Sequence, residues 1–583
     1  MFRALSLLLL SSSPAVSFSA LLLCELDRQP NTATMSLVQN AAVLVAGQLV
    51  SKLFTFSLNQ LLLSYTSPSA LGVSQLIEFV LDYTFFLSRE ALRLTIAKLP
   101  ATPQLAPARL QWTVNYSFLT FVIYLVLGTP IVYWKIVCND HNIFSLLGTF
   151  SVHHVVTAIA LCVVCELLAE SYYNVNQYVK LDFKTRTKIE SLAGFVRCIV
   201  QFLTVVLAAP RLGLQRSDID AYVFGYLAGQ LSYSFAIFVL YWYSFSFQIF
   251  KPKRVQLKGS VSAAWFEPAS WKYFQSIFVQ QLFKNFLTVG DRFVTTSLLP
   301  IQTQGYYSFI SNYGSLIARI LFAPLEESTR ITIGSFFKDT SADGQKERED
   351  FRQLALCLAN VSKIYTYLLT LLVVFAPLNT RFLLSLVFRN FNSDEVVSAF
   401  KIYWVYVLLL ALNGILEALF QSLFHSKEIV NRHSIFMFVN SVVFLSSLVL
   451  LIAEFDYGLN GLILANMVNM AMRIVYCWQA VHRFIREKAE LLQTPFYLNM
   501  SRFTPFLAAA FLLSLFQYTY FHGEVTNWKQ FLLSALCGVA LVFLVLVNEV
   551  FIPRMKRKHD CSPPSPTSPP ICRSHSNVTR SPP

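Results

Sequence analysis

The sequence predicts an all-α polytopic membrane protein with about fourteen transmembrane helices. Of its 583 residues, 55% are hydrophobic and only 13% are charged, whereas soluble globular chains carry about 25% charged residues. Apolar runs recur from residue 37 to residue 552 with no long polar interval. This pattern leaves no room for a soluble catalytic domain, so we expect no enzyme, no catalytic residues, no cofactor and no metal site.

Each expected span is an apolar run close to the roughly 20 helical residues that a bilayer core requires. The spans lie at 37–63, 69–88, 114–137, 148–170, 186–208, 221–244, 271–298, 304–329, 353–376, 397–424, 433–453, 458–482, 503–521 and 529–552. The pair at 271–298 and 304–329 is more polar than most of the others.

The distribution of Lys and Arg predicts the orientation, because loops rich in these residues stay on the cytosolic side. Every second loop is basic, and the first of them carries Arg89, Arg93, Lys98 and Arg109. The intervening loops hold only Lys135, Arg211, Arg216, Arg381, Arg389 and Lys529. An even number of spans then places both termini in the cytosol. The net charge of +14 reflects this bias, and we expect no nucleic-acid partner.

The two ends of the chain differ from its membrane-spanning part. Residues 1–34 resemble a secretory signal, but cleavage there would place the next span against the charge bias. We therefore expect a dispensable N-terminal extension, with Met35 as an alternative start. Residues 553–583 are basic and rich in Pro and Ser, which predicts a disordered cytosolic tail.

Short motifs recur in the same order and suggest an internal duplication. The matching pairs are Glu90 with Glu327, Arg93 with Arg330, Asp220 with Asp456, Gly225 with Gly461, and Glu166 with Glu417. Their offsets are 236 or 237 residues, except for the last pair at 251. We predict two six-helix lobes, at 35–258 and 259–490, followed by two extra helices within 491–552.

Polar residues inside the spans mark candidate functional positions, because a charge at the bilayer centre costs at least ~3 kcal/mol. In the eighth predicted span, 304–329, four polar residues follow one another at spacings of 3, 4 and 7 positions. They would therefore form one stripe on a helix. They are Asn312, Ser315, Arg319 and Glu326. We expect such a stripe to line a polar cavity between the lobes.

Cations in that cavity would suit an anionic substrate, because Arg and Lys bind diphosphate oxygens well. The candidate substrate-binding residues are Lys284, Asp291, Arg292, Asn312 and Arg319. Asp291 is also a possible internal partner for the nearby cations.

Other intramembrane charges are expected to form ion pairs that fix helix packing or gate the cavity. Glu90–Arg93 and Glu327–Arg330 have the i,i+3 spacing of pairs on one helix. The candidates are Arg89, Glu90, Arg93, Glu166, Glu326, Glu327, Arg330 and Glu417. Further charges interrupt spans without an assigned site: Lys52, Glu78, Asp82, Glu170, Arg197 and Arg473.

Four stretches carry a further signal: 283–296, 305–328, 87–93 and 458–466. They resemble the eukaryotic Rft family, and the resemblance extends over about 35–552. Asp291 stands where the family commonly has Glu. The resemblance implies the fold of the multidrug/oligosaccharidyl-lipid/polysaccharide flippase superfamily, in which two six-helix lobes surround a central cavity and work by alternating access.

The resemblance also implies residence in the endoplasmic reticulum membrane and a role in N-linked glycosylation. The implied partners are the lipid bilayer and a dolichol-linked oligosaccharide. The cargo would be a dolichol-diphosphate mannose-containing intermediate, moved from the cytosolic to the lumenal leaflet.

Alternative functions stay open at this point. An exporter of other amphiphiles on the same fold should have a more aromatic and acidic cavity. The predicted spans at 271–298 and 304–329 instead contain both acidic and basic residues. A membrane glycosyltransferase would need a catalytic acid in a substantial lumenal loop, and the loop at 64–68 has no carboxylate. A non-transporting accessory factor of the glycosylation pathway is compatible with the sequence. No GxxxxGK[ST] run is present, so nucleotide-driven transport is not expected.

Overall fold

The computed structural model describes residues 57–63, 65–100, 105–138, 152–208, 219–256, 263–336, 344–424, 427–492 and 503–547, and most of them are helical. Within these ranges there is no strand, only an isolated antiparallel bridge between Val255 and Ala264. Ten helices in the described part are long and apolar enough to cross a membrane. The all-α, multi-pass membrane fold is therefore confirmed.

The ten candidate spans each overlap one predicted span. They are Pro68–Ala97, Ala106–Cys138, Val152–Lys180, Lys184–Leu207, Ile219–Ser244, Arg348–Val387, Asp394–Leu423, Arg432–Glu454, Gly458–Glu490 and Trp528–Val545. The predicted spans at 271–298, 304–329 and 503–521 are also largely helical but are too polar or too short to be counted among the ten. Most of the predicted first span, 37–63, lies outside the described residues, as do the extension 1–34 and the tail 553–583. The count of fourteen stays a prediction.

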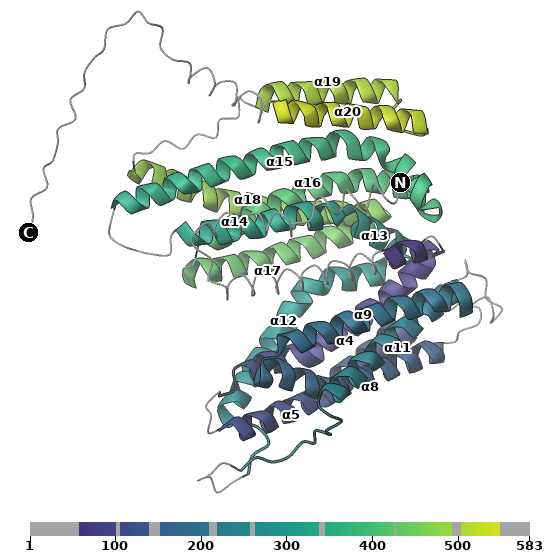
Figure 1. The fold of residues 1–583 in the computed structure, drawn as a ribbon, viewed down its shortest axis with the longest axis vertical. Helices are drawn as coiled ribbons and strands as arrows, with labels where there is room; N and C mark the ends of the chain where they lie inside the picture. Colours follow the sequence, from purple (N-terminus) through teal and green to yellow (C-terminus); the bar gives the residue numbers. More distant parts are fainter. Residues whose placement is uncertain are drawn as a thin grey trace, which may run out of the picture.

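Five helices form the first bundle (Figure 1). They are α4 (Pro68–Ala97), α5 (Ala106–Ile123), α8 (Val152–Asn174), α9 (Phe183–Leu203) and α11 (Ile219–Ser244). The sequence fixes where α4 begins, because the Ser67 side chain accepts a hydrogen bond from the Ala70 amide at 3.3 Å and Pro68 occupies the first turn. α4 contacts α5, α8 and α11, and it also contacts two helices that follow the bundle. It is therefore the element on which both halves of the molecule pack.

The second bundle follows in sequence (Figure 1). It contains α13 (Ile301–Gly314), α14 (Ala323–Phe336), α15 (Gly344–Val387), α16 (Asp394–Leu423), α17 (Lys427–Val449) and α18 (Gly458–Leu492). The long helix α12 (Pro268–Leu298) runs between the bundles and contacts both α4 and α17. Packing pairs recur, since α8 packs on α11 as α16 packs on α18. This recurrence accords with the predicted duplication, whose lobe boundaries stay a prediction.

The structure corrects the expectation of one continuous helix at 304–329. Helix α13 ends at Gly314, and the π-helical segment η6 (Ala318–Phe322) leads into α14. Pro324 lacks the N–H that would continue an α-helical hydrogen-bond ladder, and Gly314, which packs directly against the Tyr403 ring, is a poor helix former. The predicted polar stripe is therefore divided between two helical segments.

Helices α19 (Thr504–Tyr520) and α20 (Trp528–Leu546) pack on α15, outside the second bundle (Figure 1). Glu524, in the turn between them, pairs with Arg381 and accepts a hydrogen bond from Lys401 Nζ at 2.5 Å. Burial alone would raise the pKa of Glu524, but the bond from Lys401 and the two positive charges lower it below its usual value. This ion cluster fixes the turn between α19 and α20 to the second bundle.

The two bundles meet where α4 and α13 begin, and we call this the closed end of the molecule. A Cβ atom at Gly72 would lie 2.1 Å from the Ile301 carbonyl oxygen, and one at Gly305 would lie 1.9 Å from the Pro68 carbonyl oxygen. Only glycine leaves room for this backbone contact, because any side chain would separate the helices. We call the opposite end, where α9 begins, the basic end, since Arg93, Arg109 and Arg186 gather there.

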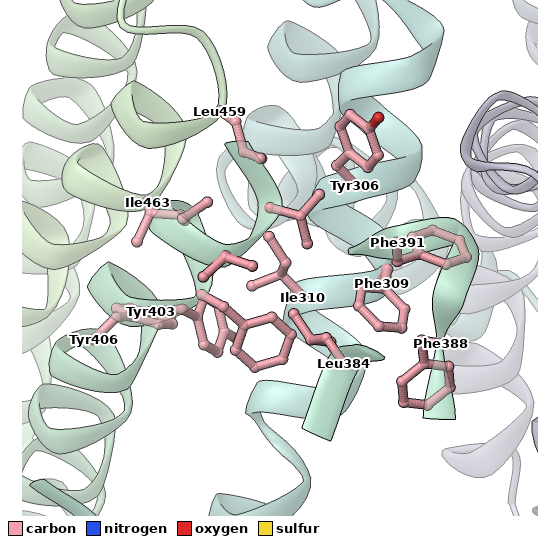
Figure 2. Close-up of a cluster of buried hydrophobic side chains, with 14 of the residues drawn as sticks. Tyr306, Phe309, Ile310, Leu384, Phe388, Phe391, Tyr403, Tyr406, Leu459 and Ile463 are labelled. Carbon is pink, nitrogen blue, oxygen red and sulfur yellow. The ribbon is translucent and has the colours of Figure 1, made fainter. Parts of the chain in front are cut away.

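A buried aromatic cluster reinforces the closed end (Figure 2). The Phe309 ring stacks on the Phe391 ring with centroids 4.2 Å apart, and Leu71 of α4 belongs to the same cluster. The side-chain amide of Asn390 donates to the Thr66 carbonyl oxygen at 3.1 Å. Side chains of both halves thus form one apolar plug across this end.

Replacing Gly305 with Ala should destabilise the protein. The added methyl group would overlap the Pro68 carbonyl oxygen, and overpacking of this kind costs about 1–3 kcal/mol. Thermal unfolding of the purified protein in detergent should show a lower midpoint for Gly305→Ala. Gly194→Ala is the matched control, because a Cβ there meets no atom within 4 Å, and its midpoint should be equal to or above that of the wild type. Equal midpoints for Gly305→Ala and the wild type would show that α4 and α13 do not touch in this way.

Candidate functional site

A cavity of about 1140 Å³ lies between the two bundles, next to the closed end. Residues of α4, α9 and α11 form one wall, and residues of α12, α13, η6 and α16 form the other. The cavity reaches Thr187 and Glu190, close to the basic end of α9. It is larger than the roughly 300–1,000 Å³ typical of pockets for drug-sized ligands. The space therefore suits a large polar group.

Three of the predicted substrate-binding residues lie on the second wall. Arg292 of α12, Asn312 of α13 and Arg319 of η6 line the cavity and are exposed to it. The Nη2 atom of Arg319 donates to the Asn312 backbone oxygen at 2.6 Å and to its side-chain oxygen at 2.9 Å. Among the described residues, its Nε and Nη1 atoms have no protein acceptor, so they are available to an anionic ligand.

Not all of the residues predicted for the cavity can be placed on its wall. α12 includes Lys284 and Asp291, but their side chains lie outside the described part of the structure, so their role stays a prediction. Ser315 lines the cavity with Arg319, whereas Glu326 does not. The Glu326 carboxylate instead lies against Gly414 of α16, where a Cβ would be 1.9 Å from its Oε1 atom. The break between α13 and α14 explains why Glu326 leaves the stripe.

The first wall carries groups that sequence reasoning did not place at a site. Glu78 and Asp82 lie one turn apart on α4, and Arg197 of α9 lies on the same cavity. The i,i+4 spacing of the two carboxylates was a usable signal for a shared face. Six tyrosines from both walls also line the cavity, but no sequence signal distinguishes them in a chain with 26 Tyr residues. They are Tyr222, Tyr226, Tyr233, Tyr313, Tyr403 and Tyr406.

A charged network within the first bundle lies near the cavity. Arg89 Nη1 binds Glu166 Oε2 at 3.0 Å, and Arg89 Nε lies 3.1 Å from Glu170 Oε2. Arg93 forms a two-pronged contact with Glu170 at 2.7 and 2.8 Å. Glu170 is only 2% exposed, and the Ser234 hydroxyl donates to Glu166 at 2.9 Å. Two guanidinium groups and two carboxylates therefore neutralise one another between α4 and α8.

This network corrects the expected pairing of Glu90 with Arg93. Among the described residues no ion pair joins them, and Arg93 binds the other helix instead. Two parallel hydrogen bonds to Glu170 are stronger than one i,i+3 contact on a helix surface. Because α4 continues to Ala97, Arg89 and Arg93 also lie within the helix rather than in a loop.

The second bundle pairs its charges differently. Arg473 of α18 forms an ion pair with Glu417 of α16, to which Asn413 and Gln421 donate at 3.3 and 3.2 Å. Glu327 and Arg330 are 3.1 Å apart at the expected spacing, but their side chains are 58% and 44% exposed. Exposed pairs contribute at most ~1 kcal/mol. The Glu417 pair is thus the stronger candidate for fixing the packing of this bundle.

Lys135, which the sequence analysis assigns to a loop, makes a buried contact between helices. It is 1% exposed, in the π-helical segment Tyr133–Cys138 that ends the α5 span. Its Nζ atom donates to the Ser297 hydroxyl at 2.6 Å, to Thr296 at 3.2 Å and to the Phe293 carbonyl oxygen at 3.4 Å. These bonds join the first bundle to the end of α12. No periodic pattern marks this contact, because Lys135 simply follows an apolar run.

Comparison with known proteins extends over most of the chain. Residues 36–558 match the family model described as Rft protein. A Saccharomyces cerevisiae protein named "Man(5)GlcNAc(2)-PP-dolichol translocation protein RFT1" is 31% identical over 548 residues, covering 87% of this chain and 93% of the relative. Proteins of the same name from Candida albicans and Mus musculus are 32% and 27% identical, covering 88% and 80% of this chain and 93% and 85% of their own lengths.

A solved structure described as an inward-facing multidrug resistance MATE family transporter of the MOP superfamily also aligns with this chain. The two are 12% identical with a TM-score of 0.44, over 75% of this chain and 95% of the other.

The buried network yields a stability prediction. Glu170→Gln should lower the free energy of unfolding by about 3 kcal/mol, because it leaves the partly buried guanidinium group of Arg93 without its counter-charge and that of Arg89 with Glu166 alone. The measurement is denaturant-induced unfolding of the purified protein in mixed micelles. Glu428→Gln is the matched control, since Glu428 and its partner Arg432 are 75% and 73% exposed, and it should change stability by less than about 1 kcal/mol. Similar losses in the two variants would contradict a buried network.

Proposed function

Because this chain belongs to the Rft protein family, we propose that it translocates a lipid-linked oligosaccharide across the endoplasmic reticulum membrane. The cargo is a dolichol-diphosphate mannose-containing intermediate that moves from the cytosolic to the lumenal leaflet for protein N-glycosylation. We place both termini and the basic end of the molecule in the cytosol, and we assign a transport role without covalent chemistry.

The observation that carries this proposal is the position of Arg292 and Arg319. Both guanidinium groups are exposed to the large cavity between the two bundles. A charged side chain at membrane depth is costly in free energy unless it contacts a partner or water. Among the described residues, Arg319 has one hydrogen-bond partner, the neutral Asn312. A diphosphate provides the acceptor oxygens that two such groups need.

The geometry supports alternating access that starts from the cytosolic side. The cavity reaches the basic end of α9, while the aromatic plug and the glycine contacts block the closed end. We propose that the glycan and diphosphate enter the cavity from the cytosol while the dolichol chain stays in lipid. Release into the lumenal leaflet then requires the contact between α4 and α13 and the Lys135 hydrogen bonds to break.

The decisive test is leaflet exchange in vesicles containing Man5GlcNAc2-PP-dolichol and the purified protein. The wild type should accelerate exchange, measured as the fraction of glycolipid captured by an external lectin with time. Arg319→Gln and Arg292→Gln should each slow the exchange about tenfold or more, because each removes charge-assisted hydrogen bonds worth roughly 1.5–3 kcal/mol. Arg432→Gln, an exposed cation on α17, is the charge-matched control and should behave like the wild type.

The same preparation also separates the alternative functions. One outcome is that the wild type leaves the rate of leaflet exchange unchanged in vesicles and still restores N-glycosylation in cells whose own Rft protein has been removed. In that case it acts as an accessory factor, and the transport proposal fails. If it moves fluorescent phospholipids or drugs as fast as the glycolipid, it is an exporter of other amphiphiles.

A further inference from the structure

A second, smaller cavity of about 230 Å³ lies beside the main one, inside the first bundle. The two cavities share five lining residues: Glu78, Asp82, Arg197, Tyr226 and Tyr233. The volume is in the range of a single sugar ring rather than of an oligosaccharide. We call this space the side pocket.

The side pocket contains a buried polar group without a partner. Tyr226 is 4% exposed and its hydroxyl has no hydrogen-bond partner among the described residues. Buried polar groups are hydrogen-bonded in most native proteins, because an unsatisfied one costs about 1–3 kcal/mol. The Tyr226 hydroxyl therefore points to a ligand. Gln230, also on the pocket wall, is 7% exposed and adds a side-chain amide beside it.

The charges of the pocket decide which ligand fits. Three carboxylates, of Glu78, Asp82 and Glu166, face two guanidinium groups, of Arg89 and Arg197. Glu166 already accepts from Arg89 and Ser234, so the free acceptor oxygens belong to Glu78 and Asp82. Asp82 has no hydrogen bond to any described residue, and Glu78 accepts only from Gln75, at 3.2 Å.

A phosphate group does not suit this pocket. Phosphate oxygens only accept hydrogen bonds and carry negative charge, so excess carboxylates repel them. A sugar hydroxyl both donates and accepts, so neighbouring hydroxyls of one ring can donate to Asp82 and Glu78 and accept from Arg197 or Gln230. The pocket thus matches a neutral polyol of ring size.

We propose that the side pocket is a hexose subsite that binds one sugar ring of the glycan head group. This proposal rests on the proposed function, and it assigns separate tasks to the two walls of the main cavity. The arginines of the second wall bind the diphosphate, and the carboxylates and Tyr226 of the first wall recognise the sugar. Specificity for the glycan then comes from α4 and α11.

The test compares two short-chain prenyl diphosphates, one bare and one carrying Man5GlcNAc2, with the purified full chain in nanodiscs. The measured quantity is the ratio of the two dissociation constants, from thermophoresis. The wild type should bind the glycosylated lipid about tenfold more tightly, as expected for one charge-assisted hydrogen bond. In Asp82→Asn, Glu78→Gln and Tyr226→Phe this ratio should fall toward one. Glu395→Gln, an exposed carboxylate at the start of α16, should keep the wild-type ratio.

Each further outcome has a defined meaning. If the three variants fold but keep the wild-type ratio, or if the wild type itself shows no preference for the glycan, the subsite proposal is overturned while the proposed function stands. If the wild type binds neither lipid, the proposed function itself fails. The conservative variant Tyr226→Phe keeps the ring packing, so a loss of preference there reports on the hydroxyl group and not on folding.

Discussion

A charged side chain inside a bilayer needs an opposite charge or water beside it, and the arrangement of this molecule depends on that constraint. Arg93 meets it within the first bundle, where two hydrogen bonds tie it to Glu170. Arg292 and Arg319 meet it at the cavity, where both are exposed. The first solution binds helices together, and the second keeps space open between them. Paired charges therefore stabilise helix packing, and the arginines exposed to the cavity determine which ligands it can bind.

The cavity has a use in transport only because one of its ends is closed. The contact between α4 and α13 depends on Gly72 and Gly305, whose backbones approach neighbouring carbonyl groups too closely for any side chain. The aromatic plug adds apolar packing from both halves. Such a seal contains few charges, so it can open without leaving buried ions unpaired. Among the described residues, Lys135 with its three hydrogen bonds to α12 and Asn390 with its bond to the Thr66 carbonyl oxygen must find new partners when the seal breaks.

Much of the fold could be predicted from the sequence, because apolar length and the charge pattern depend on local composition alone. The spans and the cavity position of Arg292, Asn312 and Arg319 follow from such local signals. The partner of Arg93 does not, because Glu170 lies on another helix and only packing brings the two together. The packing of Gly314 against the distant Tyr403 ring is likewise a tertiary contact that no local pattern marks. Local patterns thus identify which residues are unusual, and tertiary packing decides what they contact.

The two bundles pair their charges through different helices. In the first bundle α4 supplies both arginines of the network, and the carboxylates come from α8. In the second bundle Glu417 of α16 forms its ion pair with an arginine of α18. α4 is one unbroken helix, so the glycine seal, the carboxylates that face the cavity and the arginine network share a single rigid element. In the second bundle, the segment that packs on α4 is broken between α13 and α14. Motion of α4 therefore moves the seal and the carboxylates of the first wall together, whereas Arg319 lies beyond the break and is tied to α13 by its hydrogen bonds to Asn312.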